Sequence, residues 1–470
     1  MENFLSPDLA RWLISASYFV AAILFIYGLK QMSHPRTARG GVIWAGIGMV
    51  VATLITFIEP AMHNYVLMTS AIFVGGILAW WSGRVVAMTD MPQMIALYNG
   101  MGGGAAAAIA AVELLRVMTG AGLTHEAFAA RELAVVGALI GTIAFSGSMI
   151  AFAKLQGWMR KVYRFPGQRL LNGLMFLALL ALGYMLARAD FTVEMFYGFF
   201  VLALVIGVLM TVPIGGADMP VVISLYNALT GLAVGVEGFV LQNPAMMVAG
   251  IVVGSAGTLL TQLMAKAMNR SIGNVLFANF GTGDDGGSAT GPEGNMKSIE
   301  APDAAINMAY AEHVVIIPGY GMAVAQAQHK VWELTQILME NGVKVSFAIH
   351  PVAGRMPGHM NVLLAEAGVP YDLIYDLEDI NGQFPNADVS LVIGANDVVN
   401  PAARTDKSSP IYGMPILDAD KSRNVIIVKR GQGTGFSGIQ NLLFFADNTR
   451  MLYGDGAKVA QDLIAAIKTL

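Results

Sequence analysis

The sequence has 470 residues, of which 55% are hydrophobic and only 13% are charged, whereas about 25% of residues are charged in soluble globular proteins. The net charge of −4 gives no reason to expect nucleic acid as a partner, and the lack of cysteine excludes disulfides, thiolate-ligated iron–sulfur clusters and cysteine nucleophiles within this chain. Residues 1–265 are mostly apolar, while residues 281–470 have an ordinary soluble composition. We therefore expect two regions with different solvent preferences.

Nine apolar segments in the N-terminal region approach the roughly 20 residues that a helix needs to cross a bilayer. They run approximately over residues 10–29, 41–58, 65–83, 91–112, 132–153, 169–187, 192–211, 219–240 and 245–265. This pattern predicts a multi-pass membrane domain over residues 1–270, with the two termini on opposite sides. A simple anchor would not need nine helices, so a transport path is the favoured interpretation.

The loop cations predict the orientation, because Lys and Arg are concentrated in short cytoplasmic loops. The richer set of loops carries Lys30, Arg36, Arg39, Arg84, Lys154, Arg160, Lys161, Arg164, Arg169, Lys266 and Arg270. The poorer set carries Arg11, Arg116, Arg131 and Arg188. The richer side should be cytoplasmic, which also places the C-terminal domain in the cytoplasm. We expect an inner-membrane protein embedded in the lipid bilayer.

The membrane region contains an internal repeat, in which the fourth and eighth segments both begin with D-M-P-x-x-I-x-L-Y-N. Asp90 and Asp218 open the two copies, and either carboxylate can cap its helix at the membrane interface. No Lys or Arg lies close to Asp218 in the preceding loop, which favours a functional role there over capping. Asn99 and Asn227 lie about 13 Å deeper, where buried amides connect helices or line a wet path.

Three other polar side chains fall near the outer ends of the segments, and a solvated interfacial position is the expectation for each. They are His63, Glu113 and Glu237. Several glycines in the same region have the spacing that permits close contact between helices, and packing alone explains them. They are Gly100, Gly104, Gly250, Gly254 and Gly257.

Residues 281–295 are rich in glycine and polar residues, which predicts a flexible linker over residues 271–300. Beyond it, strand-like and helix-like stretches alternate through residues 301–470. Strands are expected at Val314–Ile317 and at 343–349, 371–375, 389–393 and 424–429, with a helical run to about Asn341 after the first. This alternation predicts a doubly wound, Rossmann-like α/β domain.

Loops at the ends of the predicted strands contain the candidate nucleotide-binding residues. Gly319 and Gly321 belong to a G-x-G-x-x-V motif whose glycines allow backbone N–H groups to approach a pyrophosphate. His350 takes the place of the acidic residue that ends the second strand in NAD sites, which disfavours NAD. Lys429 and Arg430 end the last predicted strand before a glycine-rich loop and suit the 2′-phosphate of NADP.

Several motifs together resemble the β subunit of proton-translocating NAD(P) transhydrogenase. In the C-terminal domain these are G-Y-G-M-A-V-A-Q-A-Q at 319–328, H-P-V-A-G-R-M-P-G-H-M-N at 350–361, G-A-N-D at 394–397 and K-R at 429–430. In the membrane domain they are D-M-P-V-V-I-S-L-Y-N at 218–227 and K-A-M-N-R-S at 266–271. The similarity covers nearly the whole chain.

This resemblance implies hydride transfer from NADH to NADP⁺, coupled to inward proton movement. NADP(H) would bind this chain, in a reversed orientation under the loop 429–436. NAD(H) would bind a separate α subunit, because this chain has one dinucleotide fold, and the αβ unit would form a homodimer. The proton path would include Asp218 and Asn227, with Asn99 and Asp90 as their counterparts in the repeat.

The predicted nucleotide site combines the strand-end loops with the residues that the resemblance carries over. It comprises Gly319, Tyr320, Gly321, Met322, Ala323, Val324, Val352, Ala353, Gly354, Arg355, Met356, Pro357, Gly394, Ala395, Asn396, Asp397, Lys429, Arg430, Gly431, Gly433, Gly435 and Phe436. No metal ligand is predicted, and no catalytic residue on this chain beyond those that position the cofactor.

Three positions depart from the family pattern. Asn99 stands where many members have a histidine, Phe436 replaces a tyrosine in the cover loop, and Leu442 replaces a proline. The first departure implies that a proton-carrying group must come from another helix or from a partner subunit.

Two other functions fit parts of the pattern. One is a transporter or channel gated by NADP(H) without hydride transfer. The other is a membrane dehydrogenase that reduces quinone, which would need a flavin, haem or iron–sulfur relay. With no cysteine and only seven histidines, the chain offers little to hold such a relay.

Overall fold

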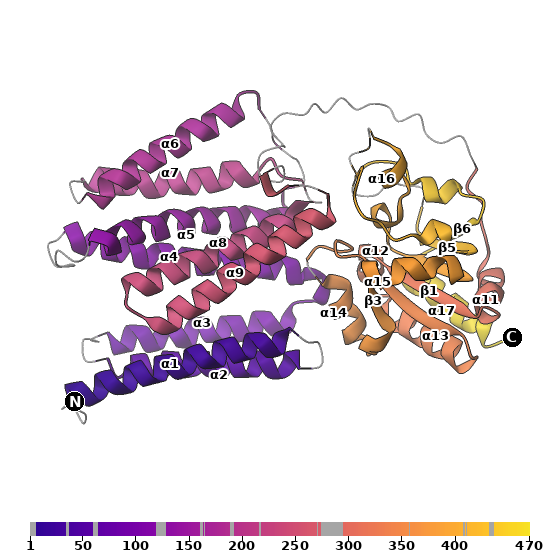
Figure 1. Ribbon diagram of the computed structural model, residues 1–470, viewed down its shortest axis with the longest axis horizontal. Coiled ribbons are helices and arrows are strands. Elements are labelled where there is room, and N and C mark those ends of the chain that lie inside the picture. The colour runs from indigo at the N-terminus through magenta and orange to yellow at the C-terminus, as the bar shows by residue number, and fades with distance from the viewer. Residues whose placement is uncertain are drawn as a thin grey trace. The chain divides into compact units, whose positions relative to one another are not determined.

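The computed structural model of the chain divides into two compact units (Figure 1). The first comprises Met1–Ile214 and Val222–Thr261, and the second comprises Gly215–Val221 and Gln262–Leu470. The structure describes residues 6–33, 37–59, 64–118, 128–159, 163, 165–188, 192–215, 218–269, 271–273, 295–356, 358–407, 409, 411–431 and 437–470. Outside these ranges lie Arg36, His63, Arg160, Lys161, Arg164, Arg270, residues 281–294, Pro357, Gly433, Gly435 and Phe436, and the side chain of Arg169 is also not described.

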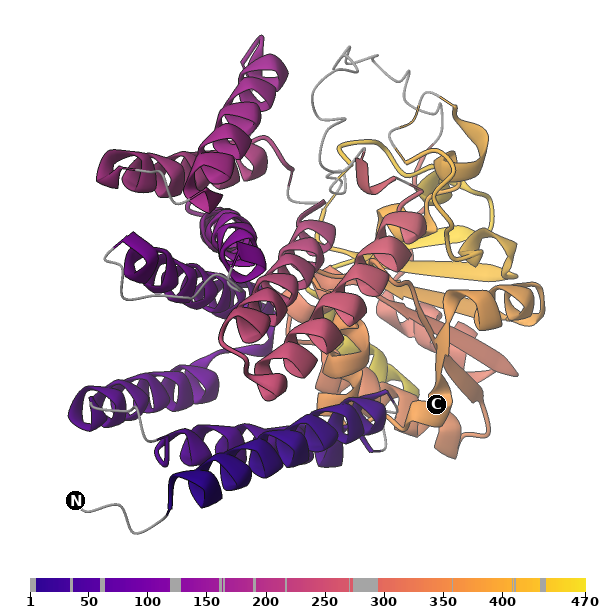
Figure 2. The same ribbon diagram turned by 60° about the vertical axis from the view of Figure 1, so that its left-hand side comes forward.

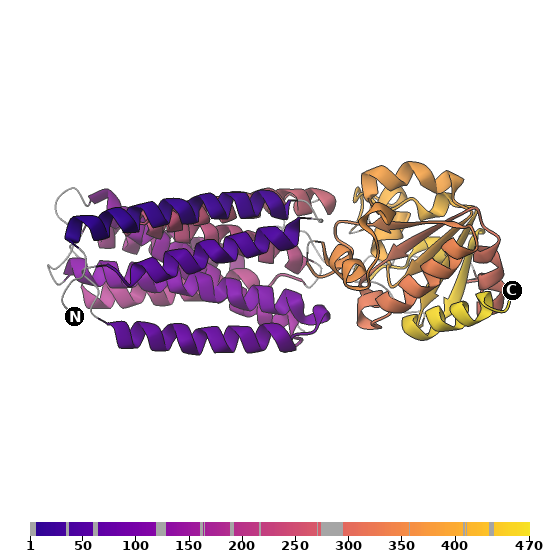
Figure 3. The same cartoon turned by 90° about the horizontal axis from the view of Figure 1, so that it is seen from below.

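Nine helices in the described ranges are long and apolar enough to cross a membrane, as the hydropathy pattern predicts. They are α1 (Pro7–Met32), α2 (Ala38–Thr56), α3 (Tyr65–Val85), α4 (Met91–Met118), α5 (Phe128–Leu155), α6 (Gln168–Ala187), α7 (Val193–Thr211), α8 (Met219–Val240) and α9 (Pro244–Ala267). Figure 3 shows them running alongside one another. Most extend a few residues past the predicted segments, because backbone hydrogen bonding continues into their more polar ends.

Glycines let the membrane helices approach closely, as expected from their spacing. A Cβ atom added at Gly231 of α8 would lie 2.5 Å from the backbone nitrogen of Gly254 on α9. One added at Gly257 of α9 would lie 2.9 Å from Cα of Ala228. Larger side chains at these positions would therefore push apart α8 and α9, which lie side by side in Figure 2.

The second unit contains a six-stranded sheet in which every neighbouring pair is parallel. Its strands are β1 (His313–Pro318), β2 (Lys344–Ile349), β3 (Ile374–Asp376), β4 (Val389–Ile393), β5 (Asn424–Lys429) and β6 (Thr449–Tyr453). The order β3-β2-β1-β4-β5-β6 is that of the doubly wound dinucleotide-binding folds. This confirms the predicted Rossmann-like class and puts the reversal of strand order between β1 and β4.

Two details of the predicted α/β pattern are wrong. Lys429 ends β5, but β5 is not the last strand, because the unpredicted β6 follows it. β3 begins only at Ile374, since residues Tyr371–Leu373 form a short 3-10 helix. The helical run predicted after Val324 is confirmed as α13 (Gln328–Glu340), and the glycine motif before it forms an additional short helix, α12 (Tyr320–Val324), with Gln326 between them at a φ of 50°.

The remaining helices of this unit are α11 (Ala301–Ala309), α14 (His359–Glu366), α15 (Leu377–Ile380), α16 (Ala402–Thr405) and α17 (Gly456–Ile467). Helix α17 begins at Asp455, whose carboxylate accepts a hydrogen bond from the N–H of Ala457 (3.1 Å). Its apolar residues recur at helical spacing and are buried, so the helix packs along one stripe. Helices α11 and α13 both contact α17 (Figure 1).

The stretch just before α11 is attached to the edge of the sheet. Ser298 forms a parallel bridge with Met451 of β6, and the N–H of Ile299 donates to the Met451 carbonyl (3.0 Å). The Met451 N–H in turn donates to the Lys297 carbonyl (2.7 Å), and Lys297 forms an ion pair with Asp447 (2.8 Å). Residues 297–299 therefore have ordered partners at the edge strand.

Candidate functional site

The loops after β1 and β4 meet at the carboxyl edge of the sheet. The N–H of Gly319 donates to the Ile393 carbonyl (2.9 Å), and the N–H of Gly321 donates to the Gly394 carbonyl (2.9 Å). A Cβ atom at Gly321 would lie 2.7 Å from Cα of Gly394, and Gly394 itself has a φ of +74°. These glycines are thus required for contact between the two loops, and their N–H groups are engaged there.

The predicted residues Tyr320 and Arg355 are brought together by the β1 and β2 loops. The Arg355 guanidinium lies over the Tyr320 ring, 4.4 Å from its centroid. The backbone N–H of Arg355 donates to Nδ1 of His359 (3.1 Å), whose ring meets that of Tyr320 edge to face at 5.9 Å. The Arg355 guanidinium therefore stacks on the Tyr320 ring, and the buried His359 ring contacts Tyr320 edge to face.

His359 was not in the predicted site, although it lies in the same loop. Burial, assisted by the charge of Arg355, lowers the pKa of His359 to about 4. The ring is therefore neutral near pH 7, and Nδ1 is the acceptor, which leaves the proton on Nε2. The left-handed backbone of Gly358 (φ +68°) just before α14 is the local signal that could have marked this position.

His350, at the end of β2, has a structural role. Its Nδ1 accepts a hydrogen bond from the N–H of Val352 (3.2 Å), so Nε2 carries the proton and donates to the Pro415 carbonyl (2.7 Å). Burial lowers the pKa of His350 to about 4. The strand end that carries an acidic residue in NAD sites thus holds a neutral, fully bonded side chain.

Asp397, after β4, connects its loop to the segment that follows the glycine-rich loop. Its carboxylate accepts hydrogen bonds from the N–H (3.0 Å) and the hydroxyl (2.7 Å) of Ser437. The Nδ2 group of Asn441 donates to the carbonyl (2.9 Å) and to Oδ1 (3.0 Å) of Asn396. Ser437 and Asn441 were missed by sequence reasoning, because nothing local indicates that they face β4.

Leu442, which departs from the family pattern, donates its backbone N–H to Oδ1 of Asn400 (3.2 Å). Proline has no N–H and could not make this bond. The departure at residue 442 therefore adds a hydrogen bond between this segment and the β4 loop.

Lys429 and Arg430 lie at the carboxyl end of β5, next to the β4 loop. The Lys429 ammonium lies 4.3 Å from the centroid of the Phe444 ring. Burial lowers the pKa of Lys429, and the charge of Asp397 opposes this effect. Arg430 and Gly431 are exposed, while Gly433, Gly435 and Phe436 of the cover loop lie outside the described residues.

The strand order explains why these residues converge, because β2, β1, β4 and β5 are consecutive in the sheet. Their carboxyl ends place four loops along one edge, across the point where the strand order reverses. In open α/β sheets this is where ligands bind. Within the described ranges, no group of three His, Asp or Glu side chains could hold a metal ion.

The membrane unit places the polar residues of the repeat between helices. Asn99 of α4 donates from Nδ2 to the hydroxyl of Ser148 on α5 (2.9 Å), and its backbone carbonyl accepts from the hydroxyl of Thr230 on α8 (3.4 Å). Asn99 and Asp218 are buried, Asn227 is half-buried and Asp90 is exposed. The four predicted proton-path residues are thus in unlike environments.

One of the loop cations, Lys154, contacts the segment before α8, which the sequence did not indicate. Lys154, near the end of α5, donates from Nζ to the carbonyls of Val212 and Ile214 (2.6 Å to the latter). The loop before Asp218 has no cation of its own in the sequence, but α5 supplies one at its start. Lys154 reaches these carbonyls because α5 packs beside the end of α7.

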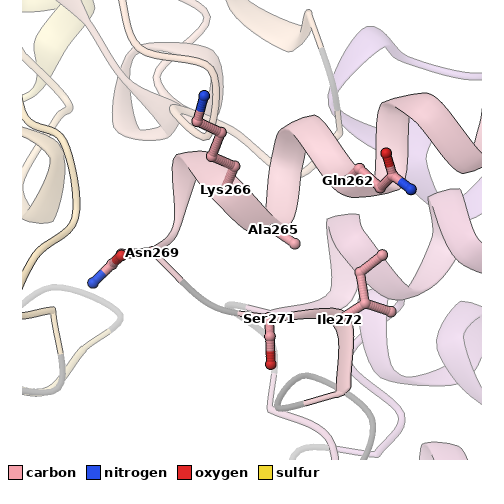
Figure 4. Close-up of a pocket in the computed structure, with 6 residues that line it drawn as sticks. All are labelled: Gln262, Ala265, Lys266, Asn269, Ser271 and Ile272. Carbon is pink, nitrogen blue, oxygen red and sulfur yellow. The ribbon is translucent and has the colours of Figure 1, made fainter.

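Lys266, Asn269 and Ser271 of the motif K-A-M-N-R-S lie at or just beyond the carboxyl end of α9 and line a pocket. The pocket is lined by Gln262, Ala265, Lys266, Asn269, Ser271 and Ile272 (Figure 4). The Lys266 side chain extends from α9 away from Ala265.

Comparison with known proteins supports one family. The family model described as NAD(P) transhydrogenase beta subunit matches residues 14–466. Two curated relatives from Rhodospirillum rubrum, one of them from a named strain, are both called NAD(P) transhydrogenase subunit beta. Each is 46% identical over 462 residues, which cover 97% of this chain and 99% of the relative. The chain therefore belongs to the NAD(P) transhydrogenase beta subunit family.

Proposed function

We propose that this chain binds NADP(H) at the carboxyl edge of its sheet and acts in hydride transfer from NADH to NADP⁺, coupled to inward proton movement. The family match over nearly the whole chain carries this proposal. The described residues form one dinucleotide-type sheet, so NAD(H) would bind the α subunit that the name of the relatives implies. The αβ unit would assemble as a homodimer.

The preference for NADP over NAD is supported by the charges at the strand ends. The end of β2 has no carboxylate to hold a ribose hydroxyl, because His350 is bonded to Pro415. Lys429 and Arg430 at the end of β5 would bind the 2′-phosphate through charge-assisted hydrogen bonds.

The described residues would position the cofactor, whose nicotinamide ring supplies the hydride chemistry. Tyr320 and Arg355 offer their stacked surface to a flat or charged part of the nucleotide. Asp397 holds Ser437, and so fixes where the cover loop returns to the sheet. The close contact between Gly319 and Gly394 would hold the β1 and β4 loops together beside the cofactor.

The membrane unit would provide the proton path, with Asp218, Asn227, Asn99 and Asp90 as its candidate residues. Nine apolar helices are consistent with a multi-pass membrane protein. The excess of Lys and Arg in one set of loops supports a cytoplasmic C-terminal domain, and we propose the inner membrane as the location. The competing function is an NADP(H)-gated transporter without hydride transfer. Its only support is that the chain combines an apolar helical unit with a dinucleotide-type unit, which the proposed function explains equally well.

The decisive experiment is hydride transfer from NADH to an NADP⁺ analogue by the purified chain, with and without its α subunit. We expect no transfer by the chain alone, because direct transfer needs two bound nicotinamides, and restored activity with the α subunit. Robust transfer without it would contradict the division between subunits. Binding of NADP(H) with no transfer in the full complex would favour the gated transporter.

The cofactor assignment has its own test. Changing Lys429 and Arg430 to alanine removes charge-assisted hydrogen bonds worth roughly 1.5–3 kcal/mol each, so NADP(H) affinity should fall by at least about tenfold per residue. Lys344→Ala, an exposed cation at the opposite end of β2, is the matched control and should bind normally. Calorimetry that shows equal NADP(H) and NAD(H) affinity in the unaltered chain would refute the assignment.

A further inference from the structure

Glu237, near the carboxyl end of α8, was expected to be solvated, and that expectation is wrong. Its relative exposure is 0%. Within the described residues, neither of its carboxyl oxygens has a hydrogen-bond partner. An ionised carboxylate in such a place would keep a large desolvation penalty, so a group like this takes up a proton instead.

The space for this carboxyl group is provided by α5. A Cβ atom added at Gly137 would overlap Oε1 of Glu237 and would lie 2.9 Å from its Cδ. The side chain therefore lies against the bare backbone of α5. Any larger residue at position 137 would displace it.

A second carboxylate, Glu113 of α4, lies close enough for its charge to act on Glu237. Glu113 is bound to Arg116 (2.8 Å), whose side chain is 60% exposed. Glu113 thus connects the enclosed Glu237 to a solvent-exposed cation. The other charged groups near the start of α5 are Arg131, which donates to the Ala187 carbonyl, and Glu132, which is exposed.

Glu113 and Glu237 lie along the same contact between helices α4, α5 and α8 that contains Asn99. On α8, Glu237 follows Thr230 by seven residues, which is close to two helical turns. On α4, Glu113 follows Asn99 by fourteen residues, which is close to four turns. Both carboxylates therefore face the junction of α4, α5 and α8, beyond the Asn99–Ser148 hydrogen bond and toward the ends opposite Asp90 and Asp218.

We propose that Glu237 is a proton-binding group of this protein, which holds a proton while enclosed and exchanges it with the carboxylate of Glu113. In each exchange one proton moves from the Glu237 carboxyl to the Glu113 carboxylate, or back, and Arg116 stabilises the ionised Glu113. This supplies the protonatable side chain that Asn99 cannot provide. The inference rests on the proposed proton movement. It assigns to this chain the proton-binding group at the end of the path opposite Asp90 and Asp218.

The test is acidification of vesicles that contain the complete complex during transhydrogenation, compared for wild type, Glu237→Gln and Glu132→Gln. Glutamine keeps the size of the side chain but cannot exchange a proton. We expect proton pumping by Glu237→Gln to fall by about a hundredfold, while NADP(H) binding persists. Glu132→Gln, an exposed carboxylate on the neighbouring helix, should pump normally.

Failure of the inference is distinct from failure of the proposed function. If wild type transfers hydride but moves no protons, the proposed function is wrong. If wild type pumps and Glu237→Gln pumps equally well, the inference is wrong.

A second measurement does not depend on the variant folding. An apolar carbodiimide reacts with protonated carboxyl groups in apolar surroundings, so wild-type complex should be labelled at Glu237 and not at Glu132. Mass spectrometry that finds Glu237 unlabelled would also overturn the proposal.

Discussion

The two copies of the D-M-P repeat share their sequence but not their surroundings. Asp90 of the first copy is exposed and accepts a hydrogen bond from Nε2 of Gln93 (3.1 Å), whereas Asp218 of the second is only 5% exposed. Tyr98 is largely exposed and bonds to the Ser82 hydroxyl (2.5 Å). Its counterpart Tyr226 is enclosed and bonds to Thr211 of α7 (2.6 Å).

This difference shows that two copies of a sequence repeat can lie in different environments. Helix α8 is enclosed by its neighbours over most of its length, while α4 is enclosed over a smaller part. Asp90 is exposed at the start of α4, where helix capping is a sufficient role. Asp218 is buried at the start of α8, so we expect a functional role at Asp218 rather than at Asp90.

The largest expected effect is a difference in proton pumping between substitutions of Asp218 and of Asp90. Asp218→Asn keeps the helix cap, because Asn caps as well as Asp, but removes the ionisable group. Proton pumping in vesicles should fall by about a hundredfold while NADP(H) still binds. Asp90→Asn should pump at nearly the wild-type rate. If both variants pump protons at the same rate, whether near the wild-type rate or near zero, the proposed difference between the two copies is wrong.

An intermediate effect concerns the space around the two tyrosines. Gly147 of α5 lies against the Tyr226 ring, and a Cβ atom there would be 2.8 Å from Cε1. Gly147→Ala should therefore destabilise the complex by about 1–3 kcal/mol through overpacking. Gly83→Ala, next to the Ser82 that bonds Tyr98, has nothing within 4 Å and should be neutral. Thermal inactivation curves of the purified complex measure both, and a neutral Gly147→Ala would mean that Tyr226 is not confined.

The smallest effect concerns the bonds that tie each copy to the next helix. Ser148→Ala removes the only hydrogen bond of the Asn99 side chain within the described residues. Thr261→Val removes the bond from Thr261 to Ser224 (3.1 Å), but Ser224 keeps the Gly257 carbonyl as an acceptor (3.4 Å).

Hydrogen bonds between membrane helices average about 0.6 kcal/mol and reach about 1.7. We expect Ser148→Ala near the upper value and Thr261→Val near the average, in chemical or thermal unfolding of the complex. A larger loss of stability for Thr261→Val than for Ser148→Ala would show that the Asn99 amide forms another hydrogen bond when Ser148 is removed.

The parts of the fold that depend on local patterns were predictable. Apolar runs and the burial of β1, β4 and β5 appear directly in the sequence, because an enclosed helix or a central parallel strand must be apolar on all sides. The missed strand β6 lies at the sheet edge and contains Thr449 and Arg450, so it lacks that signature. Glu237 was misplaced because its depth depends on Gly137, a hundred residues earlier in the chain.

The site was predictable as a set of loops but not as a set of contacts. The loops at 319–324 and 394–397 were recognised because they follow apolar strands. That the Gly321 N–H is bonded to Gly394, and that Asp397 holds Ser437, depends on which strands are neighbours. These contacts join residues far apart in the chain, so they cannot be predicted from the spacing of motifs in a single sequence.

The position of β1 in the sheet has a consequence for the order of synthesis and folding. β1 pairs with β2 on one side and with β4 on the other, so its second partner is made only after the chain from Pro318 to Val389 has emerged from the ribosome. β5 and Lys429 follow later still. The membrane helices are all synthesised before any of these strands. A chain stalled before β5 would carry the nine described apolar helices but lack the β5 end of the sheet edge, so the proposed nucleotide site can form only after β5 has been made.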